Sequence, residues 1–398
     1  MKKILVLGGG FAGIQAARAL RGTRDAQVRM VSQTGDATMV PALPDVLAGR
    51  FTPEQLRRPL GDILPEDVEL TRDTVRSVDL NARTVTGAGD TYRYDALVVA
   101  LGSEPAPAPQ FLSEFSVHSV HSLESTMELR RAVQNRLGED AFDIAVVGAG
   151  YTGLETAAAI RHGTGDHAVR ITVVDAAPEI LPMLKERQRS RVLTYLSARE
   201  IDVRPGVSLQ GVRDREGVRD STLFLSDGTA LKNPLVIWAA GMRASTVAFS
   251  GEISRSADGR VRTEDTLRVP GYPEVYVAGD AAALHRNGRD LRRAVNFAYY
   301  SGHRAGKNVA RYLAGKPQKR FVPVDLGWVL PIVHTSAGRI FGTVPVGGGP
   351  GLRMHYFMCG YRHFGGGRGL PFFATALCLR RRPYPIVPAT PRDPAEHG

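Results

Sequence analysis

The sequence contains little cysteine: only Cys359 and Cys378 occur among its 398 residues, both near the C-terminal end. They lie 19 positions apart and form no C-x-x-C or C-x-x-x-x-C pair, which excludes a redox-active disulfide, a disulfide framework and a cysteine-based metal cluster. We therefore predict no metal site. Such cysteine usage is typical of a reducing cytoplasm, and we expect both residues to be small, partly buried apolar side chains.

Long apolar runs are absent as well. No stretch of 18 apolar residues occurs, so we predict no segment that spans a membrane. Two lysines and an apolar run at the N-terminus superficially resemble a signal peptide, but Gly8, Gly9 and Gly10 interrupt that run. On this ground we reject a signal peptide and expect a cytoplasmic protein.

Positive charge is unevenly distributed. The formal net charge is +11, and between residues 286 and 320 ten basic side chains face only Asp290. A second basic run, Arg380 to Arg382, follows the apolar segment 372–379. Two interpretations stay open: a solvated basic face, or a peripheral contact with anionic lipid on the inner face of the cell membrane. No base-stacking or groove-reading motif accompanies the charge, so nucleic-acid binding is not predicted.

Glycine, in contrast, is abundant and patterned. The series Gly8-Gly9-Gly10-Phe11-Ala12-Gly13 reappears 140 positions later as Gly148-Ala149-Gly150-Tyr151-Thr152-Gly153. Each copy is followed by an apolar run that ends in glycine. The first ends at Ala100-Leu101-Gly102, 94 positions after Gly8, and the second at Ala239-Ala240-Gly241, 93 positions after Gly148. This repetition indicates an internally duplicated unit.

Each copy has the pattern of a buried strand, a glycine turn and a helix with small residues on its packing face. In such a unit the backbone N–H groups and the positive end of the helix face a pyrophosphate. The first glycine makes the turn, the second lets the backbone approach the phosphates, and the third lets the helix pack on the strand. Two units in matching phase predict an α/β protein with two Rossmann-like dinucleotide-binding domains, and an enzyme that passes electrons between two dinucleotides.

The residue at the end of the second strand of each copy distinguishes the two ligands. In the second copy this strand ends in Asp175, whose carboxylate can accept from a ribose 2′-hydroxyl and repels a 2′-phosphate. We therefore predict NADH, and Arg170 nearby keeps NADPH as an alternative. In the first copy the strand ends in Ser32 and Gln33, which carry no charge but can still bond a ribose.

The rest of the chain divides around these units. We expect the first unit over residues 1–112 and the second over residues 113–262. Each holds a meander of short strands, over residues 75–94 and 203–231. A buried strand from Val275 to Asp280 and a helix from about Arg292 to Leu313 follow.

The tail beyond Phe321 is aromatic and glycine-rich, and we interpret it as a third, smaller element. Within it, residues 347–351 and 365–367 are predicted to be loops. The proline-rich end after Arg382 is expected to be disordered.

Together these residues resemble the two-dinucleotide-binding flavoprotein superfamily over residues 1 to about 315. The resemblance implies that the first unit, residues 1–112 and 263–320, binds FAD. It implies that the inserted residues 113–262 bind NAD(P)H and that residues 321–398 form a C-terminal element. Val275 to Asp280 looks like the family's second FAD fingerprint, in which Asp280 bonds the ribityl chain. We assign cofactor binding to Gly8, Gly10, Phe11, Ala12, Gly13, Ser32, Gln33, Ala100, Gly102, Gly148, Gly150, Thr152, Gly153, Asp175, Gly241, Gly279, Asp280, Asn296 and Phe297.

Within the superfamily, the sequence most closely resembles the type II NADH dehydrogenases, which transfer electrons from NADH through FAD to a quinone. Thr152-Gly153-Leu154-Glu155 is similar to that family's Thr-Gly-Val-Glu, whose glutamate lies near the nicotinamide and the flavin. Ala294 to Ala298 loosely resembles its Ala-Gln-x-x-Ala helix start beside the quinone, with Asn296 near the glutamine position.

We name Glu155, Tyr151 and Asn296 as catalytic candidates. Glu155 is expected to be a negative group that attracts the oxidised nicotinamide, or else a first-turn glutamate stabilised by the helix dipole. Tyr151 either covers the flavin until NADH arrives or packs between the domains.

Three alternatives stay open for the function. In the first two, the electron acceptor is a quinone, as in the type II enzymes, or a soluble acceptor such as oxygen, a small metabolite or a redox protein. In the third alternative the chain is a slowly turning-over flavin-binding regulator. Many members of the superfamily are dimers, which leaves a homodimer as a further expectation.

Overall fold

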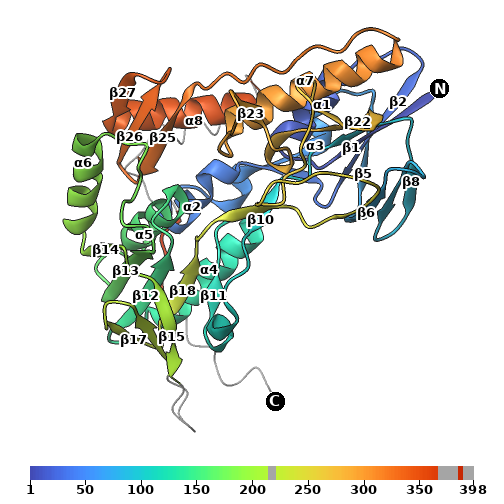
Figure 1. Ribbon diagram of the computed structural model, residues 1–398. Helices are drawn as coiled ribbons and strands as arrows, with labels where there is room; N and C mark the ends of the chain where they lie inside the picture. Colours follow the sequence, from blue (N-terminus) through green and yellow to red (C-terminus); the bar gives the residue numbers. More distant parts are fainter. Residues whose placement is uncertain (214–220, 366–383, 389–398) are drawn as a thin grey trace, which may run out of the picture.

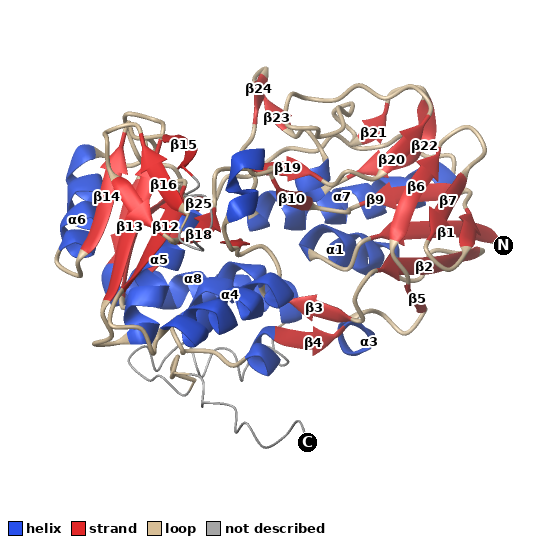
Figure 2. Ribbon diagram, turned by 90° about the horizontal axis from the view of Figure 1, so that it is seen from below, coloured by secondary structure: helices blue, strands red, loops and turns tan. Residues whose placement is uncertain are grey.

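The computed structural model describes residues 1–213, 221–365 and 384–388. Two β-sheets, the second all parallel and the first parallel except for one edge strand, lie at opposite ends of the molecule, and Figure 2 shows helices between them. A smaller C-terminal unit lies on the same side of the molecule as the second sheet, as Figure 1 shows.

The first sheet has six strands in the order β21-β22-β9-β1-β2-β5, all parallel except β21. Helices α1 (Phe11–Leu20) and α7 (Val295–Leu313) pack against each other and against β9. Since β22 lies beside β9, the chain returns to this sheet after completing the second one. The strands are β1 (Lys2–Leu7), β2 (Ala26–Ser32), β5 (Val68–Arg72), β9 (Ala96–Val99), β21 (Arg268–Val269) and β22 (Tyr272–Val277).

The second sheet has five parallel strands in the order β11-β18-β12-β13-β14. Its central strand β12 ends in four consecutive buried residues, the pattern of a strand covered on both faces. The strands are β11 (Val117–His118), β12 (Phe142–Val147), β13 (Val169–Asp175), β14 (Ile201–Pro205) and β18 (Leu235–Trp238), and the helices of this unit are α4 (Leu123–Arg136), α5 (Tyr151–Thr164) and α6 (Glu186–Ser197).

Both predicted meanders are present as antiparallel strands. The first comprises β6 (Val75–Asp79), β7 (Thr84–Gly87) and β8 (Thr91–Arg93). A fourth strand, β20 (Ala248–Ser250), pairs in parallel with β6. The second comprises β15 (Leu209–Arg213), β16 (Thr222–Leu225) and β17 (Ala230–Lys232). The predicted start of the second meander at Val203 is wrong, because Val203 belongs to β14 and pairs with Val173 in the parallel sheet.

Short elements join the two sheets. β10 (Ser103–Pro105) and β19 (Met242–Ala244), which follow the two apolar runs, pair with each other. The remaining short elements are β3 (Asp36–Thr38), η1 (Val40–Ala42), α2 (Leu43–Leu47), η2 (Pro53–Leu56), β4 (Arg57–Pro59), α3 (Leu60–Ile63), η3 (Gln110–Glu114), η4 (Gly279–Ala281), β23 (His285–Arg286) and β24 (Arg289–Asp290).

The C-terminal unit is more regular than its composition suggests. It comprises the antiparallel strands β25 (Gly327–Ile332), β26 (Thr335–Ile340) and β27 (Val344–Gly347), followed by α8 (Gly348–Phe364). Figure 1 shows α8 and α7 along the same side of the molecule. The predicted loop over residues 347–351 is wrong, since residues 348–351 form the first turn of α8.

The end of the chain departs from the expected disorder at residues 384–388. Arg130 of α4 donates to the Pro385 carbonyl, and its guanidinium lies 3.9 Å from the Tyr384 ring centroid. Disorder is therefore wrong for these five residues. The other residues of the predicted tail, the loop at 366–367 and Cys378 lie outside the described residues.

Candidate functional site

The two glycine turns have the same backbone geometry. Gly8 and Gly148 both adopt the left-handed conformation, with φ of +100° and +108°. A Cβ atom on Gly8 would lie 2.4 Å from the Ala100 carbonyl oxygen, and one on Gly148 would lie 2.5 Å from that of Ala239. Each first glycine is thus pressed against the carbonyl that follows the neighbouring strand, which explains why the two signatures recur together.

The other glycines of each turn also match. A Cβ on Gly13 or Gly153 would lie 1.8 or 1.9 Å from the carbonyl oxygen of the first glycine of its turn, so both positions permit close helix packing. Around Gly10 and Gly150, in contrast, no atom lies within 4 Å of a Cβ position. The open space lies where the helix begins, at the place where a pyrophosphate would meet backbone N–H groups.

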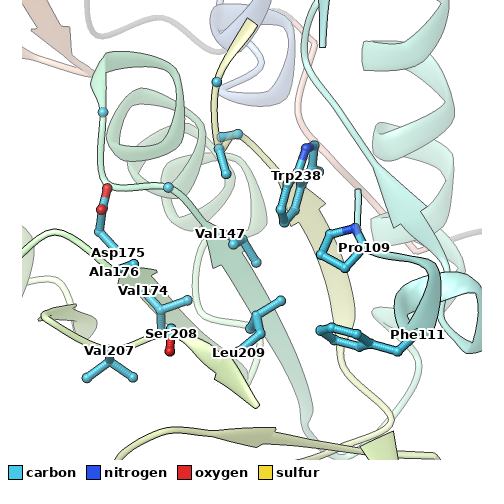
Figure 3. Close-up of a pocket in the computed structure, with 15 residues that line it drawn as sticks. Pro109, Phe111, Val147, Val174, Asp175, Ala176, Val207, Ser208, Leu209 and Trp238 are labelled. Carbon is cyan, nitrogen blue, oxygen red and sulfur yellow. The ribbon is translucent and has the colours of Figure 1, made fainter. Parts of the chain in front are cut away.

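A cavity of about 570 Å³ lies over the second turn, between β13, β18 and the segment around η3. Figure 3 shows Asp175 on one side of it, and Pro109, Phe111 and Trp238 on the other. The Trp238 indole N–H donates to the Ala106 carbonyl at 2.7 Å, which fixes this wall. Gly148, Gly150 and Gly241 line the same cavity.

Asp175 and Ser32 occupy equivalent positions. Val147 pairs with Val174 and Leu7 pairs with Val31, so the next residue of each strand is Asp175 or Ser32. Asp175 accepts the Ala149 N–H and the Ala177 N–H, both at 2.8 Å. Ser32 is 5% exposed and lies against Gly9, while Gln33 is exposed at the strand end.

Asp280 lies beside the first turn. Gly279 precedes it with a φ of +67°, and a Cβ on Gly279 would be 2.8 Å from that of Ala12. The Asp280 carboxylate accepts the Ser103 hydroxyl at 3.0 Å, and burial raises the pKa of this carboxyl. The short stretch after Gly102, whose φ is +73°, is thereby joined to the predicted second fingerprint.

Asn296 and Phe297 are buried at the start of α7. The Asn296 amide donates to the Val324 carbonyl at 2.8 Å, and the Arg292 guanidinium lies 5.3 Å from the Phe297 ring. Arg292 also forms an ion pair with Asp325. These contacts attach the C-terminal unit to α7.

The aromatic residue that opens each turn helix contacts the C-terminal unit. The Phe11 ring lies 4.1 Å from that of His363, and the Tyr151 ring lies 5.4 Å from that of Trp328. Burial raises the pKa of Tyr151. Thr152, the next residue, is exposed.

Glu155 lies where the three units meet. With Pro41 and Asp45 from the first unit and Pro331 from β25, it lines a small cavity. Burial, together with the nearby Asp45, raises the pKa of Glu155 well above its ordinary value. The direction of this shift opposes the negative charge that the sequence suggested for Glu155. Glu155 is also the fifth residue of α5, so it lies beyond the first turn.

Comparison with known proteins agrees with this geometry. The family described as pyridine nucleotide-disulphide oxidoreductase matches residues 2–302, about three quarters of the chain. The chain belongs to this family.

Individual relatives resemble this oxidoreductase over most of its length. A protein of Staphylococcus saprophyticus named type II NADH:quinone oxidoreductase is 27% identical, over 86% of this chain and 90% of that protein. The sulfide:quinone oxidoreductase of Aquifex aeolicus has a TM-score of 0.76 at 17% identity and covers 95% of this chain and 92% of its own. The water-forming NADH oxidase of Lactobacillus brevis has a TM-score of 0.71 at 21% identity, over 85% and 75%. The two structures establish the fold alone.

This oxidoreductase is an FAD-dependent NAD(P)H enzyme, with FAD and NADH as its cofactors. The open space at Gly10 and Gly150 fits two dinucleotides, because nothing from the protein fills the place where phosphates would approach. Because the chain has no cysteine before Cys359, the disulfide to which the family's name refers cannot form early in this chain. Cys359 is buried in α8, where burial raises its pKa to about 12.

No helix in residues 1–213, 221–365 or 384–388 is long and apolar enough to cross a membrane. Over those same residues, no group of His, Cys, Asp or Glu is arranged to hold a metal ion.

Sequence reasoning missed five residues at this site: Asp45, Arg50, Tyr356, Trp328 and His363. No signal in the sequence pairs them with the glycine turns, because the contacts that bring them to the site join segments far apart in the chain. The one available hint was the run of aromatic residues in the tail.

Proposed function

We propose that this oxidoreductase transfers electrons from NADH to a quinone, with NADH at the second glycine turn and FAD at the first. The observation that carries the proposal is the duplicated turn, in which both second glycines face open space. The relatives named type II NADH:quinone oxidoreductase support a quinone as the acceptor. When bound, FAD accepts a hydride from NADH and passes the electrons on, which is chemistry that no side chain supplies.

On this proposal the protein binds and orients the reactants. The first N–H groups of α1 and α5 bind the two pyrophosphates, and Asp280 bonds the ribityl chain of FAD. Asp175 selects NADH, because the negatively charged 2′-phosphate of NADPH would face its carboxylate. Glu155, held neutral at the meeting point of the three units, supplies the proton that the quinone takes up.

The C-terminal unit is the proposed contact with the quinone pool and the inner membrane face. Five apolar side chains of the described residues beyond Phe321 are more than half exposed: Val322, Phe341, Phe357, Tyr361 and Val387. Lys316 and Lys319 lie close before Val322 in the chain. Apolar side chains beside basic ones are suited to an anionic lipid surface.

The test is anaerobic reduction followed by a choice of acceptors. The purified protein should show flavin absorption that NADH bleaches. A short-chain quinone should then restore the absorption at least about tenfold faster than oxygen or a ferredoxin-type protein, a difference of about 1.4 kcal/mol in barrier. Equal or faster recovery with oxygen would mean that the acceptor is not a quinone. Co-sedimentation with anionic but not neutral vesicles tests the membrane contact separately.

A further inference from the structure

Asp45, Arg50 and Tyr356 form a closed hydrogen-bonded triad in the protein interior. Arg50 Nη1 donates to Asp45 Oδ1 at 3.0 Å and to the Tyr356 hydroxyl oxygen at 3.0 Å. The Tyr356 hydroxyl in turn donates to Asp45 Oδ2 at 2.6 Å. All three residues are at most 7% exposed, and the triad joins α2 of the first unit to α8 of the C-terminal unit.

The triad is rich in donors around Asp45. Both carboxylate oxygens already accept a hydrogen bond, and Arg50 Nε and Nη2 have no partner among the residues that the structure describes. Burial raises the pKa of Asp45, while Arg50 and Tyr356 oppose that rise. A carboxylate with a guanidinium and a phenol against it is a stable place for a buried negative charge.

Glu155 lines the same small cavity as Asp45, but it has no guanidinium or phenol donating to it among the described residues. Within the described residues, no hydrogen bond or ion pair to Glu155 is present. The titratable groups around it are Asp45 from α2, Tyr356 and Cys359 from α8, and Tyr151 from its own helix. Pro331 of β25 and Val333, the residue after its end, complete this wall of the cavity and are apolar. None of these groups is a cation, and two carboxyl groups in one apolar cavity do not both ionise readily.

We propose that Asp45 is a positioning residue: the triad fixes one negative charge on it and thereby keeps Glu155 neutral and able to donate a proton. This inference rests on the proposed function, in which NADH, one proton and a quinone give NAD⁺ and a quinol. Glu155 gives its proton to a quinone oxygen, becomes a carboxylate and regains a proton from solvent. The fixed charge on Asp45 favours that return.

The direct test is the protonation state of Glu155 in the FAD-loaded protein, measured without turnover. The C=O stretch of a neutral carboxyl group, present in the parent and absent in Glu155→Gln, is followed by infrared spectroscopy as the pH is raised. Asp45→Asn removes the negative charge beside Glu155, so the midpoint should move to lower pH by about one unit. A parent lacking this band at neutral pH, or a midpoint unmoved in the variant, overturns the inference.

Two further proteins keep the test interpretable. Asp45→Asn leaves Arg50 buried without its counter-ion and can fail to fold, so the double variant Asp45→Asn/Arg50→Gln removes the whole ion pair and should shift the midpoint in the same direction. The matched control Asp143→Asn/Arg170→Gln removes an ion pair between the neighbouring strands β12 and β13 of the second sheet and should leave the midpoint in place. A control that shifts equally would overturn the inference.

Kinetics then separate this inference from the proposed function. The rate of quinone reduction should fall as the pH rises through the Glu155 midpoint, and in Asp45→Asn this fall should begin about one unit lower. NADH-dependent flavin bleaching should keep its rate. If the infrared midpoint shifts but no quinone is reduced, the triad acts as inferred and the quinone proposal fails. If quinone is reduced with the same pH profile in both proteins, the inference fails alone.

Discussion

Asp175 uses both carboxylate oxygens to hold the second glycine turn and its own strand end. Serine, the residue at the equivalent position of the first copy, cannot accept both backbone N–H groups at once. We expect Asp175→Ser to raise the KM for NADH about tenfold, since a charged hydrogen bond contributes about 1.5–3 kcal/mol. The KM for NADPH should fall, because the repulsion of the 2′-phosphate is removed. Steady-state kinetics with both nucleotides measures this change.

The control for that substitution is Asp202→Ser on β14, which removes an exposed ion pair with Arg204 and should change neither constant. An unchanged preference for NADH in Asp175→Ser would contradict the assignment of nucleotide choice to this carboxylate.

Tyr151 poses a second question at the level of one residue. Its ring lies against Trp328, and its hydroxyl is buried without a partner among the described residues. We expect a packing role: Tyr151→Ala should lower the free energy of unfolding by about 2 kcal/mol and Tyr151→Phe should not. Stopped-flow measurement should give the same nicotinamide affinity and rate of flavin reduction for all three proteins. Faster reduction in Tyr151→Ala would instead support a gate over the flavin.

At the scale of one element, different glycines of each turn serve folding and ligand binding. Gly150 has a φ of −74° and open space at its Cβ position, whereas a Cβ on Gly153 would clash with the Gly148 carbonyl at 1.9 Å. Gly150→Ala should therefore keep the thermal midpoint and weaken NADH binding at least about tenfold. Gly153→Ala should lose about 3 kcal/mol of stability.

The first turn provides the matched pair for this experiment. Gly10→Ala should lower the flavin content of the purified protein while Gly150→Ala leaves it unchanged, as judged by absorption spectra and nucleotide titration. Loss of flavin in both variants would mean that the two turns do not serve separate ligands.

The glycine turns could be predicted from the sequence because their constraints are local: a left-handed φ and a close carbonyl select glycine wherever the turn occurs. Helix α8 could not, since glycines at 348, 349 and 351 disfavour a helix by their intrinsic propensity. Packing against β26 overrides that preference here. The raised pKa of Glu155 was likewise missed, because burial and Asp45 cause it, and neither is visible in a local pattern.

At the scale of the whole molecule, Arg130 connects three parts of the chain. It lies on α4 of the second unit, is 1% exposed, and donates to the Val46 carbonyl of the first unit at 3.0 Å and to the Pro385 carbonyl near the C-terminus. Tyr384, whose ring contacts the guanidinium, donates its N–H to the Gly49 carbonyl at 3.0 Å. One buried cation thus satisfies carbonyls from two segments that no sheet joins to α4.

Removing this cation should loosen the three parts together. We expect Arg130→Met to lower the free energy of unfolding by about 3 kcal/mol, because the buried Val46 carbonyl and the Pro385 carbonyl lose their donor while most of the side-chain volume remains. Amide exchange should rise in residues 43–49 and 384–388 as well as in α4, whereas the exposed neighbour variant Arg131→Met should change none of them. Faster exchange confined to α4 would show that Arg130 stabilises only its own helix, and that other contacts hold the C-terminal segment against the first unit.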